Sequence, residues 1–217
     1  MKRRAQGNRS THASRITPHG SSALQGQIVA SFGRRYLVEL ADASLLDCVT
    51  RGKRGALACG DRVRVASSAA GEGVIESLEP RTTLLYRSDH VRQKLVAANV
   101  TQIVIVVAPL PAFHEELLNR CLAAAEHGGM AALIAVNKSD MEQAPETLRA
   151  LEPYRRLGYR VVAFSAKRDL APLTPHLMGQ TSVLVGQSGV GKSTLINALV
   201  PEAMVRVAEL SAALDAG

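Results

Sequence analysis

The chain has 217 residues, enough for one large or two small domains, and 47% of them are hydrophobic, which allows a buried core. No apolar run approaches the roughly 18–20 residues of a transmembrane helix, and the three cysteines form no C-x-x-C pair, so a cytoplasmic protein with reduced thiols is expected rather than a membrane or disulfide-stapled one. The net charge of +7 and a pI of about 9.7 favour a polyanionic partner, with nucleic acid ahead of a membrane surface.

The N-terminal segment is basic. Residues 1–20 contain Lys2, four arginines and no acidic residue. No hydrophobic segment follows Arg3 and Arg4, so this is neither a secretion signal nor a twin-arginine signal. We expect residues 1–24 to form a disordered basic arm, which either binds RNA or aids solubility.

Residues 25–85 have the pattern of a small β domain. Short runs rich in β-branched residues predict strands over 27–32, 35–40, 45–49, 62–66 and 73–78. Gly33 and Arg34 lie between the first two runs and predict a hairpin turn. This number of short strands is typical of a closed OB-type barrel, with an SH3-like barrel as the alternative.

Basic side chains gather in the predicted loops of this barrel. We expect the RNA-binding residues to be Arg34, Arg35, Arg51, Lys53 and Arg54. Aromatic residues are scarce at 3% of the chain, so contacts to the phosphates and shape of structured RNA are favoured over base stacking. The alternative is a barrel that only presents these charges to solvent.

Residues 86–217 alternate strands and helices. Residues 80–98 are predicted to link the two regions. Buried strands are predicted over 101–107, 131–136, 160–164 and 181–185. Helices are predicted over 113–127 and 145–157, and a third begins at Lys192 and ends before Pro201. This alternation predicts a doubly wound α/β sheet.

Two short motifs follow predicted strands and fit a guanine base. The first comprises Asn137, Lys138, Ser139 and Asp140. An ionised Asp140 only accepts hydrogen bonds, so it suits the N1–H and 2-amino group of guanine and would be unpaired against adenine. We expect Asn137 to bond the other edge of the base and the Lys138 stem to cover its face. The second motif comprises Ser165, Ala166 and Lys167, where the Ala166 N–H is expected to meet guanine O6.

A phosphate-binding loop of the form G-x-x-x-x-G-K-[ST] lies between the strand at 181–185 and the last helix. Its residues, with the one that follows, are Gly186, Gln187, Ser188, Gly189, Val190, Gly191, Lys192, Ser193 and Thr194. Strand, glycine loop and helix are the context this motif requires. We expect Lys192 and Ser193 to be the catalytic residues, with Lys192 on the β- and γ-phosphates and Ser193 on Mg²⁺.

The order of these motifs is unusual, because both base-reading motifs precede the phosphate loop. With Gly60-Asp61, residues 51–53 and residues 95–103, this order resembles the circularly permuted bacterial GTPases of small ribosomal subunit biogenesis, the RsgA or YjeQ family. The resemblance implies an OB barrel, a permuted P-loop GTPase domain and a zinc-binding tail. It also implies GTP or GDP with Mg²⁺ as ligands, and the small ribosomal subunit and its RNA as partner. We further expect a monomer without a membrane role.

The end of the chain departs from that family. Nothing after Thr194 matches a switch threonine, an Asp-x-x-Gly loop or the zinc-ligand cysteines. We therefore expect a C-terminally truncated, incomplete GTPase domain. No water-positioning residue can be named, since His114 and His127 fit ordinary surface histidines better.

The predicted function is GTP binding and hydrolysis in late maturation of the small subunit. The alternatives are an RNA-binding module with an inactive nucleotide site and an ATP-dependent P-loop kinase.

Overall fold

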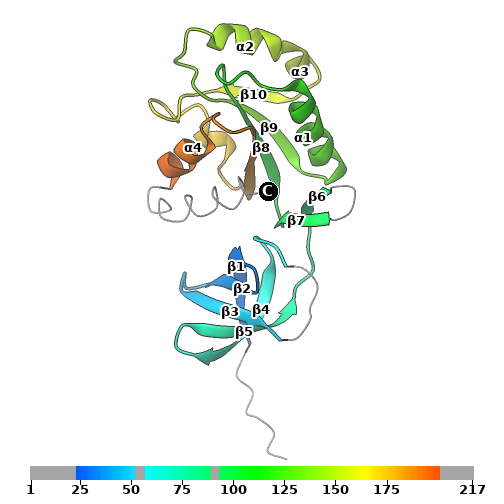
Figure 1. Ribbon diagram of the computed structural model, residues 1–217, viewed down its shortest axis with the longest axis vertical. Coiled ribbons are helices and arrows are strands. Elements are labelled where there is room, and N and C mark those ends of the chain that lie inside the picture. The colour runs from blue at the N-terminus through cyan, green and yellow to red at the C-terminus, as the bar shows by residue number, and fades with distance from the viewer. Residues whose placement is uncertain (1–22, 52–56, 89–92, 201–217) are drawn as a thin grey trace, which may run out of the picture.

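The computed structural model describes residues 23–51, 57–88 and 93–200 (Figure 1). Residues 1–22 of the basic arm that we expect over residues 1–24 lie outside the described residues. Figure 1 shows a β barrel at one end of the molecule, an α/β unit at the other, and a small hairpin between them.

The barrel is formed by β1 (Leu24–Phe32), β2 (Arg35–Leu40), β3 (Leu45–Thr50), β4 (Arg62–Ala69) and β5 (Glu72–Leu78). It closes in the order β1-β2-β3-β5-β4, with β1 also paired to β4. Strand β4 has the alternating pattern of a barrel strand: Val63 and Val65 are buried in the core, while Arg62 and Arg64 face solvent. The expected OB-type barrel is confirmed.

A hairpin occupies the segment that we expected to be a linker. Strands β6 (Leu84–Ser88) and β7 (Gln93–Ala98) pair antiparallel. Residues 80–98 were predicted only to link the two regions, and the structure adds that most of them pair as a hairpin. Only one side of the hairpin packs on a core, through Leu85 and Ala97. The alternation of apolar and polar residues is therefore weak in the sequence, where charged residues dominate the segment.

The α/β unit has a four-stranded parallel sheet in the order β10-β9-β8-β11. Its strands are β8 (Gln102–Val107), β9 (Ala131–Val136), β10 (Arg160–Ala163) and β11 (Ser182–Val185). All six residues of β8 are buried, which explains why the five that follow Gln102 are all apolar.

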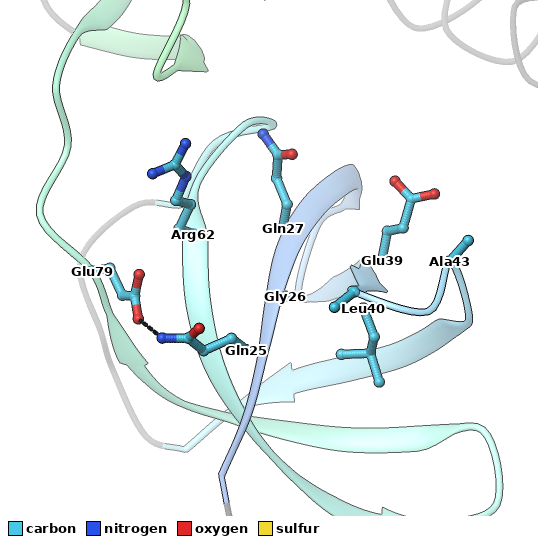
Figure 2. Close-up of a pocket in the computed structure, with 9 residues that line it drawn as sticks. Gln25, Gly26, Gln27, Glu39, Leu40, Ala43, Arg62 and Glu79 are labelled. Carbon is cyan, nitrogen blue, oxygen red and sulfur yellow. Dashed lines mark hydrogen bonds between the residues drawn. The ribbon is translucent and has the colours of Figure 1, made fainter.

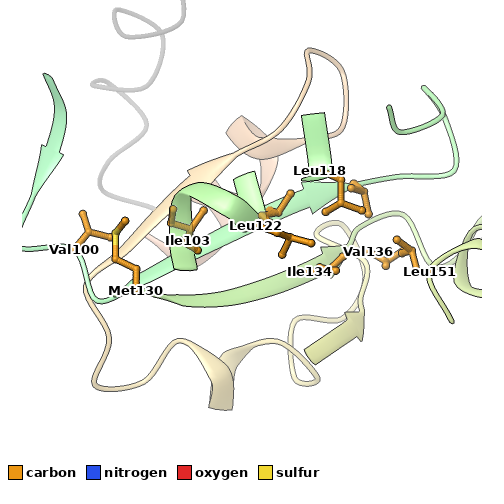
Figure 3. Close-up of a cluster of buried hydrophobic side chains, with 11 residues drawn as sticks. Val100, Ile103, Leu118, Leu122, Met130, Ile134, Val136 and Leu151 are labelled. Atoms are coloured by element: carbon orange, nitrogen blue, oxygen red, sulfur yellow. The ribbon is translucent and has the colours of Figure 1, made fainter. Parts of the chain in front are cut away.

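Helices cover both faces of this sheet. On one face Ile103 and Ile105 pack with α1 (Glu115–His127), as part of the cluster in Figure 3. On the other face Val104 and Val106 pack with Leu195 of α4 (Lys192–Leu199). The predicted doubly wound arrangement is confirmed.

The helix predicted over residues 145–157 is divided in two. The structure has α2 (Ala144–Ala150) and α3 (Glu152–Arg156), joined at Leu151. Pro153 lacks the N–H that a continuing helix would need, so a new helix starts around it. The break places Leu151 in the core with no exposed surface. Across the part of the chain that the structure describes, which also has a short 3-10 turn (Thr174–His176), no helix has the length and apolar character to span a membrane.

Candidate nucleotide-binding site

Three functional loops meet at one edge of the parallel sheet. Asn137 follows β9, Ser165 lies two residues beyond β10, and Gly186 follows β11. Because these strands are parallel, their carboxyl ends lie on the same edge, where open α/β sheets bind ligands.

A pocket of about 270 Å³ opens between these loops. Most of its lining comes from the two base-reading motifs, and the phosphate loop contributes the rest. The lining residues are Asn137, Lys138, Asp140, Met141, Ser165, Ala166, Lys167, Gly191 and Thr194. Ser139 lies just outside the lining and donates its N–H to the Phe164 carbonyl at 3.0 Å.

Asn137 holds the three loops together. Its side chain is 2% exposed, and Nδ2 donates to the Val190 carbonyl of the phosphate loop at 2.9 Å. Its Oδ1 accepts from the Lys138 N–H at 2.8 Å and from the Ala166 N–H at 2.9 Å. Asn137 and the Ala166 N–H, which we expect to face the base, are thus also bonded to each other and to the neighbouring loops. Asn137 therefore sets the spacing between base-reading and phosphate-binding backbone.

Lys138 makes a second connection between the loops. Its backbone has a positive φ of 60°. Its ammonium donates to the Leu110 carbonyl beyond β8 and, at 2.8 Å, to the Gly189 carbonyl of the phosphate loop. Lys138 also lines the pocket. The Leu110 contribution was missed, and only the Pro109-Leu110-Pro111 run could have pointed to a structured loop there.

Asp140 presents an ionised carboxylate. The hydroxyl of Ser165 is the main cause that lowers the pKa of Asp140, and its own backbone N–H, Arg168 and Lys167 add to the effect. Arg168 Nε lies 3.3 Å from Asp140 Oδ2, and 28% of the Asp140 side chain remains exposed. The group is therefore an acceptor that a ligand in the pocket can reach.

The phosphate loop depends on two glycines in conformations that other residues rarely adopt. At Gly186 a Cβ would lie 2.3 Å from the Val106 carbonyl oxygen, so the loop could not leave β11 so close to β8. Gly191, with φ of 95°, begins α4, and a Cβ there would lie 2.4 Å from Asn137 Nδ2. Both positions need the absence of a side chain.

The polar side chains of this loop have defined positions. The Lys192 ammonium donates to the Gly186 and Gln187 carbonyls at 2.8 and 2.9 Å. Gln187 Nε2 donates to the Ala112 carbonyl at 2.8 Å. Ser193 and Thr194 are exposed in the first turn of α4, and Ser188 is exposed in the loop. The loop thus offers cationic and hydroxyl groups beside the helix N-terminus, which suits phosphates.

The two histidines occupy opposite edges. His114 precedes α1 on the edge that holds the pocket, and His127 ends α1 on the other edge. Both are exposed. His127 is therefore too remote to act in the pocket.

The basic residues of the barrel lie at one of its ends. Arg35 pairs with Val49 across β2 and β3, so Arg34 and Arg51 leave the sheet at the same end. All three arginines are exposed, and Arg35 forms an ion pair with Asp47 at 2.7 Å. Lys53 and Arg54 lie outside the described residues.

The barrel also has a hollow of about 400 Å³ between β1, β2 and the start of β4 (Figure 2). Arg62 faces it together with Glu39 and Glu79, and Gln25 Nε2 bonds Glu79 Oε1 at 3.0 Å. Arg34, Arg35 and Arg51 do not line it. Its mixed charge makes it a poor RNA groove, so the basic end remains the RNA-binding candidate.

Comparison with known proteins places these features in a family. A sequence model of the family described as RsgA GTPase matches residues 78–217. A protein of Nitrosospira multiformis named small ribosomal subunit biogenesis GTPase RsgA is 53% identical over 198 residues, which are 91% of this chain and 63% of that protein. Its namesake in Nitrosomonas europaea is 50% identical over 200 residues, 90% of this chain and 64% of the relative. The chain therefore spans somewhat less than two thirds of the length of these relatives.

Solved structures agree with the sequence matches. The crystal structure of YjeQ from Thermotoga maritima has a TM-score of 0.66 and 31% identity, over 82% of this chain and 65% of that one. The crystal structure of YloQ, a circularly permuted GTPase, has a TM-score of 0.63 and 30% identity, over 86% of this chain and 67% of that one. With its barrel, its parallel sheet and its rotated order of motifs, this chain belongs to the RsgA GTPase family.

Proposed function

We propose that this chain binds and hydrolyses GTP as part of a factor that matures the small ribosomal subunit. One observation carries the proposal, namely the pocket in which an ionised Asp140 and the phosphate loop face the same space. The names of the relatives support the ribosomal role.

The guanine base lies in this proposal between the two base-reading motifs. Asp140 accepts from N1–H and the 2-amino group, and the Lys138 stem covers one face of the ring. Asn137 spaces the loops through the bonds described above, and the second hydrogen of its Nδ2 is left to donate to the other edge of the base, where N7 and O6 accept. Ser139, Ser165, Ala166 and Lys167 complete the base-reading loops.

The phosphates lie along residues 186–194. Lys192 reaches them by exchanging the Gly186 and Gln187 carbonyls for phosphate oxygens, since its ammonium already lies over the loop. The exposed Ser193 hydroxyl at the start of α4 fits one ligand position of Mg²⁺, which takes its remaining oxygens from phosphates and water. When bound, Mg²⁺ neutralises the charge that develops on the γ-phosphate. The chain's own residues thus hold and orient the phosphates for attack by water.

Zinc has no part in this proposal. The resemblance implies a zinc-binding tail, but the described residues contain no group of three His, Cys, Asp or Glu side chains that could hold a metal.

RNA binding belongs to the barrel in this proposal. Arg34, Arg35 and Arg51 lie at one end of it, and Lys53 and Arg54 follow Arg51 in the sequence. Residues 25–85 then act on RNA and residues 86–217 on the nucleotide, although β6 runs across residue 85. The arm over residues 1–24 adds positive charge, and the factor acts as a monomer in the cytoplasm. Phosphate contacts of this kind weaken steeply with salt.

Nucleotide titration of Asp140→Asn tests the assignment of the base. The amide cannot accept both guanine donors, so we expect GTP affinity to fall by roughly tenfold or more while ATP affinity changes little. Asp42→Asn is the matched control, because Asp42 lies in an exposed barrel turn where it binds Ser44. An unchanged preference for GTP over ATP in Asp140→Asn would contradict the assignment.

Turnover measured with purified small ribosomal subunits tests the activity. We expect the subunit to stimulate GTP hydrolysis. RNA binding without any stimulated turnover would instead support a binding module with an inactive nucleotide site.

A further inference from the structure

The barrel is joined to the α/β unit by a small polar cluster that the nucleotide site does not use. We call Gly60, Asp61, Arg81 and Asn99 the junction cluster. Gly60 and Asp61 belong to the barrel loop before β4, Arg81 to the segment after β5, and Asn99 to the end of the β6–β7 hairpin. Figure 1 shows this hairpin between the two units.

Asp61 is buried, yet all of its charge is matched. Its side chain has no exposed surface, and its two oxygens accept from Arg81 Nε at 2.7 Å and Arg81 Nη2 at 2.8 Å. Asp61 Oδ2 also accepts from the Ala58 N–H at 2.8 Å. The hydrogen bond to Asp61 is the main cause that raises the pKa of Arg81. A buried two-pronged pair tolerates little displacement, because any shift strands a desolvated carboxylate.

Asn99 ties the same loop to the hairpin. Its Nδ2 donates to the Gly60 carbonyl at 2.9 Å, and its Oδ1 accepts from the Thr82 N–H at 2.9 Å. The residue is 8% exposed and has a φ of 56°, a conformation in which Asn is one of the few acceptable residues. Asn99 therefore contacts the barrel loop and the connecting segment at once.

The backbones at this junction are in direct contact. A Cβ at Gly60 would lie 2.0 Å from the Ala98 carbonyl oxygen. The Ala98 N–H donates to the Cys59 carbonyl at 2.8 Å, and Cys59 forms a β-bridge with Ala97. No side chain separates the barrel from β7 at this point, so the two cannot slide without breaking these bonds.

The junction cluster continues directly into the sheet. Val100 follows Asn99 and is buried in the core beneath α1. Strand β8 starts two residues later and ends at Val107, whose carbonyl accepts from the Asn137 N–H at 2.8 Å. Strand β8 therefore begins three residues after Asn99 and ends at the edge of the sheet that holds the nucleotide pocket.

We propose that the junction cluster locks the barrel and the α/β unit into one orientation, so that the basic end of the barrel and the nucleotide pocket move as a single rigid body. Units joined by a small interface and a linker move relative to each other by default. Here the buried Asn99 amide and direct backbone contacts between the barrel and β7 oppose that motion, and the buried Asp61–Arg81 pair fixes the segment that leaves β5 against the barrel loop.

The test compares the tumbling of the two units by ¹⁵N relaxation. The double variant Asp61→Asn with Arg81→Met removes both charges at similar side-chain volume, and an amide at 61 still accepts from the Ala58 N–H. The matched control is Glu116→Gln with Arg120→Met, an exposed ion pair within α1. We expect one shared rotational correlation time in the unmodified chain and in the control, and two distinct times in the double variant.

A second variant keeps the test independent of charge burial. Asn99→Ala removes no ion pair and breaks the bonds to Gly60 and Thr82, so it should also separate the two correlation times. If the double variant loses its dispersed amide signals and is therefore unfolded, Asn99→Ala alone tests the proposal. Two correlation times in the unmodified chain, or one shared time in a folded Asn99→Ala protein, would overturn the proposal. GTP affinity should change less than about twofold in the folded variants. If the unmodified chain did not bind GTP at all, the proposed function would be contradicted, but the rigid junction would not.

Discussion

Replacing Asn137 by alanine should destabilise the α/β unit. The change removes the hydrogen bonds to Val190, Lys138 and Ala166 from a side chain that is 2% exposed. Each buried bond contributes about 1 kcal/mol net, and an orphaned buried group costs about 1–3 kcal/mol. Lys138 is only half-buried, and water can enter the space that the amide leaves, which moderates the loss. We therefore expect the free energy of unfolding to fall by about 2–4 kcal/mol.

Urea unfolding followed by helix circular dichroism measures this loss. All the described helices lie in the α/β unit, so the signal reports on that unit rather than on the barrel. The matched control is Asn119→Ala, because Asn119 is exposed on α1 and accepts one bond, from the Tyr154 hydroxyl at 3.0 Å. The control should change stability by less than about 0.5 kcal/mol. Equal effects of the two substitutions would refute the spacer role.

An isosteric change separates the two halves of the Asn137 contact. Asn137→Asp keeps the acceptor for Lys138 and Ala166 but places an oxygen against the Val190 carbonyl at a 2.9 Å separation. We expect GTP affinity to fall in this variant as well, because the phosphate loop would be pushed from its position. GTP affinity equal to that of the unmodified chain, measured calorimetrically, would show that the loop does not depend on this contact.

Three further predictions concern the pocket. Gly191→Ala should lower both stability and GTP affinity more than Gly179→Ala, because both glycines have positive φ but only Gly191 lacks space for a Cβ; equal thermal shifts would contradict this. Lys192→Ala should abolish most GTP affinity and leave RNA affinity unchanged in filter binding, and equal loss of both would mean that the units are not separable. The pKa of Asp140 is lowered in the folded protein. The carboxylate is therefore ionised above the ordinary carboxyl pKa, and it is protonated only as pH falls through the lowered pKa of the folded state. GTP affinity measured from pH 7 down to about pH 5 should therefore show no loss from this group.

The sequence was sufficient wherever the signal is local. The strand at residues 131–136 is a continuous apolar run whose last four residues are buried, and the loop at 186–193 has the glycines that its positive-φ positions require. Both motifs were predicted because neighbouring residues alone determine their backbone. The convergence of their loops followed from the rule that parallel strands end on one edge.

The sequence was insufficient where a side chain chooses between distant partners. Nothing in the sequence indicated that the Asn137 amide bonds a carbonyl 53 positions away in the chain. The hairpin β6–β7 was not predicted, because which of its residues are buried depends on the core that it packs against, and that core is formed by distant parts of the chain. Pro153 could have indicated the break between α2 and α3, yet periodicity alone favoured one continuous helix.

The amino-acid sequence by itself determined the order of the motifs, the classes of the main elements and the chemical groups offered to a nucleotide. Tertiary structure alone decided the partners of those groups, by pairing Lys138 with Leu110 and Asn137 with Val190, and it alone brought Asp61 and Arg81 together at the junction. The physical reason is that a hydrogen-bonding group shows its chemistry in the sequence, whereas its partner depends on which backbone the folded chain brings within about 3 Å.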